Sequence, residues 1–153
     1  IFIPIHRGAE GFMNFSQFEE FYWPTLTTLM ESLIKNGLIP MPFFEGKYTD
    51  RFSYLAEFAK KHKGKLIYWF AQSDLARAKD EFGDYVCIKG NIPASLFIAG
   101  TPNQVEAYVK KSIEDCMEGG GYIVASSGIP DEAKAENVKA MTDAVFKYGF
   151  YST

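Results

Sequence analysis

The sequence has few cysteines, which excludes several kinds of site. Its 153 residues include two, Cys87 and Cys116, which are far apart in segments of different pattern. They form no Cys-x-x-Cys motif and no metal-binding pair. Neither is next to a base or at a helix start, so we expect both to pack in the core. This cysteine usage fits a reducing compartment, and we expect the cytoplasm.

The sequence also has no long apolar run and no excess of positive charge. No run reaches the roughly 18 residues of a membrane-spanning helix, and the first residues lack a basic segment leading into an apolar one. The formal net charge is -3 and the pI is about 5.4. We therefore expect a soluble protein that binds neither nucleic acid nor membrane. The chain begins with Ile1 rather than Met, which suggests that upstream residues were removed.

What the chain does have is apolar and aromatic residues in a repeated pattern. Hydrophobic residues make up 47% of it and aromatic residues 16%, enough for one α/β unit with a core over residues 1–153. Continuous apolar runs predict strands at 1–5, 38–44, 66–70, 85–88 and 121–125. Helical periodicity predicts helices at 16–37, 49–64, 73–83, 101–116 and 133–148.

Local signals refine two of these elements. Ser16 and Glu19 have the spacing of a capping box, which predicts the start of the first helix. Pro24 lies inside that helix and predicts a kink or the start of a second helix. Pro40 and Pro42 make the second strand the least regular one, because both missing N–H groups would face the same neighbour.

The alternation of strands and helices predicts an α/β fold with a parallel sheet, and the continuous apolar runs predict strands covered on both faces. Right-handed crossovers leave two arrangements, a doubly wound sheet and an arc of a barrel. Both place functional groups at the carboxyl ends of the strands. Polar residues gather at those ends: His6 and Arg7; Glu45, Lys47 and Arg51; Gln72 and Asp74; Lys89 and Asn91; Ser126 and Ser127.

Glu45 and His6 are the main candidates for chemistry at this predicted rim. The Glu45 carboxylate could bind a metal ion or act as a general acid or base, or it could form an ion pair with Lys47 or Arg51. His6 could be a second ligand or an acid-base group, or an ordinary loop residue beside Arg7.

Further residues at the rim are candidates for substrate binding. Arg51 and Gln72 are polar side chains that follow two of the strands. Asp74 could orient a substrate or cap the helix that follows it. Lys89 and Asn91 could contact an anionic group, although Asn91 precedes an Ile-Pro dipeptide and is also a typical turn residue.

The loop at 126–130 is the last candidate. Ser126 and Ser127 begin it and Gly128 follows them. The loop could offer backbone donors to a carboxylate or phosphate, with Ser126 binding substrate. It could equally be a plain connection between a strand and a helix.

Three segments resemble the uroporphyrinogen decarboxylase superfamily, which also contains zinc- and cobalamin-dependent methyltransferases. They are FMNFSQFEEFYWP from residue 12, CIKGNIPASLFIAGTPNQVEAYVKKSIE from residue 87 and GGGYIVASSGIPDEAKAENVKAM from residue 119. The resemblance implies a TIM (β/α)8 barrel, of which this chain is the carboxyl-terminal half. A half barrel has two open strand edges, so it also implies a partner, either the missing amino-terminal half or a second copy.

The resemblance implies one of two chemistries. In the methyltransferases, a His-x-Cys at one strand end and a later Cys hold zinc, which activates a thiol. Those positions fall on Phe43, Glu45 and Ser127, of which only Glu45 could bind a metal. In the decarboxylases, which need no cofactor, a histidine lies near the carboxylates of the tetrapyrrole, and its position again falls on Ser127.

The function we expect from this resemblance is methyl transfer to or from a corrinoid on a partner protein. Its catalytic residues would be Glu45, Ser127 and His6, with Glu45 as a zinc ligand or a general base. The first alternative is uroporphyrinogen decarboxylase, an enzyme of porphyrin biosynthesis. The lost histidine and the net negative charge count against it, because its substrate carries many carboxylates. The second alternative is a non-catalytic binding module.

Overall fold

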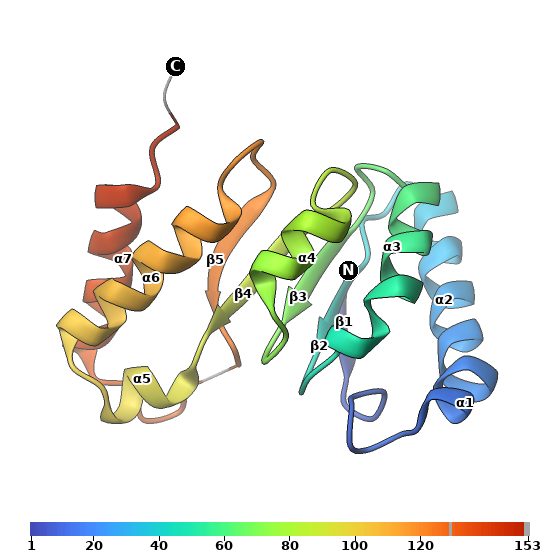
Figure 1. The fold of residues 1–153 in the computed structure, drawn as a ribbon, viewed down its shortest axis with the longest axis horizontal. Coiled ribbons are helices and arrows are strands. Elements are labelled where there is room, and N and C mark those ends of the chain that lie inside the picture. Colours follow the sequence, from blue (N-terminus) through green and yellow to red (C-terminus); the bar gives the residue numbers. More distant parts are fainter. Residues whose placement is uncertain (129, 152–153) are drawn as a thin grey trace.

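The computed structural model describes residues 1–128 and 130–151, and it shows a five-stranded sheet flanked by helices (Figure 1). The strands are β1 (Phe2–Ile5), β2 (Met41–Phe44), β3 (Ile67–Phe70), β4 (Cys87–Ile92) and β5 (Tyr122–Ser126). The helices are α1 (Phe15–Gln17), α2 (Trp23–Lys35), α3 (Phe52–Lys61), α4 (Leu75–Phe82), α5 (Ala94–Ala99), α6 (Pro102–Cys116) and α7 (Ala135–Tyr148). A π-helical segment, Phe18–Tyr22, joins α1 to α2, and a 3-10 turn, Thr49–Arg51, precedes α3. Among the described helices, none is both long and apolar enough to cross a membrane.

The order of the strands decides between the two predicted arrangements. All neighbouring strands are parallel, and their order in the sheet is β1-β2-β3-β4-β5. A doubly wound sheet reverses its strand order at a switch point, and this sheet has no reversal. Successive right-handed crossovers in one direction place the helices on one side of the sheet, as in a barrel. The fold is therefore an arc of a (β/α)8 barrel, as predicted.

The two faces of the sheet differ in how well they are covered. Phe44, Phe70 and Ile88 are fully buried and pack in a core with the helices. We call the opposite side, turned away from the helices, the open face. On it, Phe2 is 50% exposed and Ile123 is 40% exposed. The prediction that both faces are covered is thus wrong for this chain, because its helices reach only one of them.

β2 is shorter than the strand predicted at 38–44, and its prolines face β3. The carbonyl of Pro40 accepts a hydrogen bond from the N–H of Ile67, and the Phe44 carbonyl accepts one from the residue that follows β3. Backbone groups two residues apart point to the same neighbouring strand, so Pro42, which lies between these two, also faces β3. The regular strand consequently begins at Met41 rather than at residue 38.

Two helix starts differ from the prediction or refine it. Asn14, rather than Ser16, caps the first helix: its side chain accepts a hydrogen bond from the Gln17 N–H, and the Gln17 side-chain oxygen accepts one from the Asn14 N–H. Pro24 does mark the start of a second helix, since α2 begins one residue before it. The short helix α5 is absent from the predicted elements, and it lies directly after β4.

Candidate functional site

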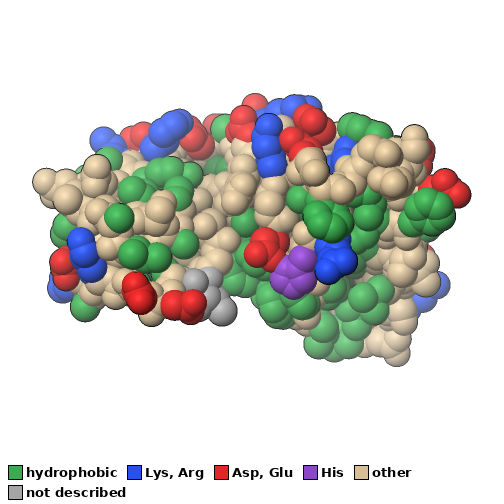
Figure 2. Space-filling view, turned by 90° about the horizontal axis from the view of Figure 1, so that it is seen from below, with side chains coloured by type: hydrophobic (Ala, Val, Ile, Leu, Met, Phe, Trp, Pro, Cys, Tyr) green, Lys and Arg blue, Asp and Glu red, His purple; other side chains and the backbone are tan. Residues whose placement is uncertain are grey.

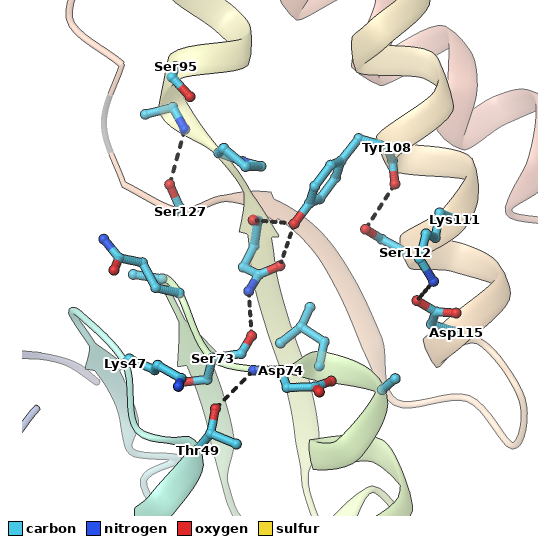
Figure 3. Close-up of a pocket in the computed structure, with 17 residues that line it drawn as sticks. Lys47, Thr49, Ser73, Asp74, Ser95, Tyr108, Lys111, Ser112, Asp115 and Ser127 are labelled. Carbon is cyan, nitrogen blue, oxygen red and sulfur yellow. Dashed lines mark hydrogen bonds and ion pairs between the residues drawn. The ribbon is translucent and has the colours of Figure 1, made fainter. Parts of the chain in front are cut away.

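The main cavity lies at the carboxyl ends of β2 to β5 and opens between α4 and α6. Its volume is about 1000 Å³. Figure 3 shows side chains reaching it from three directions. They come from the segments after β2 and β3 (Lys47, Thr49, Ser73, Asp74), from those after β4 and β5 (Ser95, Ser127), and from α6 (Tyr108, Lys111, Ser112, Asp115).

Asn91 connects the two sides of this cavity. It is 8% exposed, its Nδ2 donates to the Ser73 carbonyl at 2.7 Å, and its Oδ1 accepts from the Tyr108 hydroxyl at 3.3 Å. Burial raises the pKa of Tyr108 above its ordinary value, so this hydroxyl keeps its proton and remains a donor. Asn91 therefore holds the loop after β3 against α6.

The loops around the cavity are fixed by bonds between side chain and backbone. The Asp74 carboxylate caps α4 by accepting from the Arg77 N–H at 3.0 Å, which establishes the capping role proposed for it. Asp74 also donates its own N–H to the Thr49 hydroxyl at 3.2 Å. The Ser127 hydroxyl accepts from the Ala94 N–H at 3.1 Å and so joins the end of β5 to α5. These bonds tie the loops that form the walls of the cavity to the neighbouring elements.

The charges around the cavity are balanced. Lys111 and Asp115 form an ion pair at 2.7 Å, and the carboxylate of Asp74 lies on the opposite wall. Lys47 pairs with Glu10 at 3.4 Å. Gln72 lines the cavity with an exposed amide and has no hydrogen bond within the described residues. The site is therefore polar and close to neutral, which suits a small ligand with hydrogen-bonding groups better than a polyanion.

His6 and Glu45 form a separate pair at the carboxyl ends of β1 and β2, which we call the mouth of the arc. His6 Nδ1 contacts Glu45 Oε2, and the two side chains are 61% and 51% exposed. Figure 2 looks onto this end of the molecule, where charged and histidine side chains lie among hydrophobic ones. Glu45 does not line the cavity that Asn91 and Ser127 share. Of the residues expected at the predicted rim, Asn91 and Ser127 therefore share a cavity, and Glu45 lies outside it.

Three other predicted site residues lie outside the cavity. Arg51 is 3% exposed, and its guanidinium donates to the Met13 carbonyl at 2.6 Å. Lys89 lies on the open face, with its Nζ over the ring of Trp69. The Ser126 hydroxyl donates to the carbonyl of Gly128, within the predicted loop 126–130, of which Ile129 lies outside the described residues.

The donors that the family would use for zinc do not come together in this chain. Phe43 has no donor atom, and its ring packs against Trp69 with centroids 4.6 Å apart. The Ser127 hydroxyl is engaged with α5, and Glu45 pairs with His6. Within residues 1–128 and 130–151, no three His, Cys, Asp or Glu side chains are close enough to hold a metal ion. The residues present therefore do not fit the zinc site of the methyltransferases.

Four residues that line the cavity have a helical spacing in the sequence that the sequence analysis did not use. Tyr108, Lys111, Ser112 and Asp115 are spaced as i, i+3, i+4 and i+7, so they form one polar stripe on α6. Ser112 is buried on this stripe and donates to the Tyr108 carbonyl. A polar stripe next to the buried face of a helix is a sign that the helix borders a polar cavity.

Comparison with known proteins identifies the family. A family model described as Uroporphyrinogen decarboxylase (URO-D) matches residues 3–148, and no curated protein matches the chain. A structure of a methyltransferase from Methanosarcina mazei is similar, with a TM-score of 0.80 and 18% sequence identity over 98% of this chain. The match covers 42% of that protein, so this chain spans less than half of its length, and at this identity the likeness shows the fold alone. Because the family model covers nearly every residue, the chain belongs to the uroporphyrinogen decarboxylase family.

Proposed function

We propose that this chain is the carboxyl-terminal half-barrel of an enzyme that transfers a methyl group to or from a corrinoid on a partner protein. The observation that carries this proposal is the polar, charge-balanced cavity at the carboxyl ends of the strands, where barrel enzymes of this kind hold their substrates. Gln72, Asp74, Asn91 and Ser127 would bind the methyl acceptor or donor there. The similar structure from Methanosarcina mazei is itself described as a methyltransferase.

The charges of the site favour this function over decarboxylation of a porphyrinogen. A substrate with many carboxylates needs several free cations, ideally arginines. Here Lys47 and Lys111 each have a carboxylate partner, and Arg51 is buried. Among the described residues, the cavity thus offers no row of free cations, whereas a small methyl donor or acceptor needs none.

The His6–Glu45 pair would supply acid-base chemistry at the mouth. With the hydrogen on Nδ1, the imidazole donates to the Glu45 carboxylate and leaves the lone pair of Nε2 free to accept a proton. In the methylation of an acceptor X–H, the new C–X bond would replace the bond between the methyl group and its donor, the electron pair of the broken bond would stay on the donor, and the X–H proton would be released. His6 would take this proton, and Glu45 would hold the ring in the required tautomer.

The experiment uses the full-length protein that contains this chain. Methylcobalamin, supplied as a free corrinoid, is incubated with the protein and a panel of small thiols, alcohols and amines, and its loss is followed by visible absorbance. We expect turnover with at least one acceptor. Gln72→Ala should raise KM for that acceptor several-fold, whereas Glu118→Ala, an exposed residue outside the cavity, should have no effect.

Two outcomes would contradict this proposal. Release of carbon dioxide from a porphyrinogen without loss of methylcobalamin would assign the protein to the decarboxylases. The absence of any turnover, together with binding of one of the small molecules, would indicate a binding module that has kept the barrel and lost the chemistry.

A further inference from the structure

The position of a family zinc ligand is filled here by an aromatic cluster. Phe43 packs against Trp69, and Phe2 lies 6.2 Å from the first ring and 5.8 Å from the second, measured between centroids. The three rings lie on the open face of the sheet. The indole N–H of Trp69 donates to the Ser126 carbonyl at 3.1 Å, which fixes the plane of that ring. A metal ion would meet hydrocarbon here instead of a ligand.

A positive charge lies directly beside this cluster. In the register of the sheet, Phe43 is opposite Trp69, and Trp69 is opposite Lys89. The Lys89 ammonium lies 3.6 Å from the centroid of the Trp69 ring and 4.0 Å from the sulfur of Met41. This is a cation–π contact at close range. The open face thus carries its own cation in the row where the resemblance to the methyltransferases places a zinc ligand.

The Lys89 ammonium contacts an aromatic ring and a thioether but no carboxylate within the described residues. Within the described residues no carboxylate lies within ion-pair distance of it, whereas Lys47, Lys61, Lys110, Lys111, Lys139 and Lys147 all have one. Its side chain is half-buried, and burial lowers its pKa, an effect that Cys87 partly opposes. A half-buried cation that lacks an anion gains free energy when an anion binds to it.

We propose that the Lys89 ammonium, held over Trp69, takes the place of zinc and binds the anionic group of the substrate. This inference rests on the proposed function for the existence of a substrate in the arc. Zinc binds and stabilises a thiolate in the methyltransferases that this family resembles. An ammonium group can do the same for a carboxylate or a thiolate, because it offers three donors and one positive charge. The flat rings beside it favour a substrate with an apolar or aromatic body next to that anion.

The test measures anion binding at Lys89 without any turnover. The chain has two tryptophans, so Trp23→Phe leaves Trp69 as the fluorescent reporter within this chain, and the fluorescence that remains after Trp69→Phe is subtracted as background from the rest of the protein. The full-length protein with this replacement is titrated with benzoate, an aromatic carboxylate, and with benzamide, its neutral analogue. Lys89→Met and Lys89→Arg are compared, and Lys65→Met, an exposed lysine outside the arc, is the control.

We expect benzoate to bind more tightly than benzamide. Lys89→Met should weaken benzoate about 10- to 100-fold, the range for a lost charge-assisted hydrogen bond, and leave benzamide unchanged. Lys89→Arg should retain most of the affinity, and Lys65→Met should retain all of it. Zinc analysis of the same preparations should find well below one equivalent per chain after purification with zinc present.

Three results would overturn the inference. One is equal benzoate binding by Lys89→Met and the parent protein. Another is the absence of benzoate binding together with a large loss of stability in Lys89→Met, which would show that Lys89 pairs with a carboxylate elsewhere in the protein. The third is stoichiometric zinc that disappears on Glu45→Gln. Benzoate binding is measured without turnover, so it can be found even if the proposed methyl transfer is not. Methyl transfer by an enzyme that holds zinc would contradict the Lys89 inference but not the proposed function.

Discussion

Asn137 joins the start of α7 to the end of α5, and its replacement tests how the wall of the cavity is held. The side chain is completely buried. Its Nδ2 lies 3.0 Å from the Leu96 carbonyl oxygen, 3.1 Å from that of Phe97 and 2.9 Å from that of Gly100. These carbonyls end α5, where the Leu96 oxygen also accepts from the Gly100 N–H and the Phe97 oxygen from the Lys134 N–H, so the Asn137 amide adds further bonds at the helix end. We predict that Asn137→Ala destabilises the protein and loosens α5.

The size of the expected loss of stability follows from the number of N–H hydrogens on the Asn137 amide. The amide has two N–H hydrogens, so it makes two full bonds at a time to the three carbonyls. At about 1 kcal/mol for each bond, plus a further penalty for a buried carbonyl left unpaired, Asn137→Ala should cost about 2–3 kcal/mol. Asn137→Asp keeps the shape but places a carboxylate against three carbonyl oxygens. We expect it to cost about 3–5 kcal/mol, as for an unpaired buried charge.

Urea unfolding of the full-length protein, followed by circular dichroism, measures both effects. The matched control is Asn36→Ala, because the Asn36 amide donates to the Ser32 carbonyl at 2.8 Å from an exposed position. This control should change the free energy of unfolding by less than about 0.5 kcal/mol. The reasoning is refuted if Asn137→Ala costs no more than the control, or if Asn137→Asp is as stable as the parent protein.

Two further replacements test the sheet and the contact between α6 and α7. A Cβ added at Gly90 would overlap the carbonyl oxygen of Phe70, and the new alanine would have to keep the backbone φ of +135°. Gly90→Ala should therefore lower the free energy of unfolding by at least about 2 kcal/mol. An unchanged urea midpoint would contradict this. The 2.8 Å hydrogen bond from Lys147 lowers the pKa of Glu106, so this contribution to stability is present at neutral pH and is lost as the pH falls through the lowered pKa. Glu106→Gln should therefore lower the urea midpoint at pH 7 but not below that pKa, and an equal loss at both would count against the ion pair.

The strands could be predicted from the sequence because each is a continuous apolar run. The same continuity suggested cover on both faces, and only one face is covered. In β3, Phe70 packs against the helices, whereas Trp69 lies on the open face with Phe2. The side chains on both faces of the strands are apolar because the interior of a barrel is itself a packed core. The apolar pattern of the strands thus fits a complete barrel. In the arc that this chain forms, the apolar side chains of the open face are not covered.

The strand order and the helix α5 could not be predicted in the same way. Apolar runs show where strands are but not which of them are neighbours, so the residue pattern alone left the arc and the doubly wound sheet open, and only the family resemblance predicted the arc. Helix α5 has six residues, too few for a helical period to stand out, and Pro93 directly before it resembles a turn signal. Asn14 was missed as a cap because Ser16 offered a second, equally plausible spacing.

The candidate site was only partly predictable because the prediction assigned every polar residue at a strand end to one common site. Side chains alternate between the two faces of a strand, so Lys89 and Asn91, two residues apart, should face the same way. In the structure Lys89 lies on the open face, whereas Asn91 contacts Ser73 and Tyr108 on the side of the helices. Gly90 lies between them with a φ of +135°, a conformation that breaks the alternation. A glycine inside a strand signals such a break, so it could have shown in advance that the two polar neighbours face different sides of the sheet.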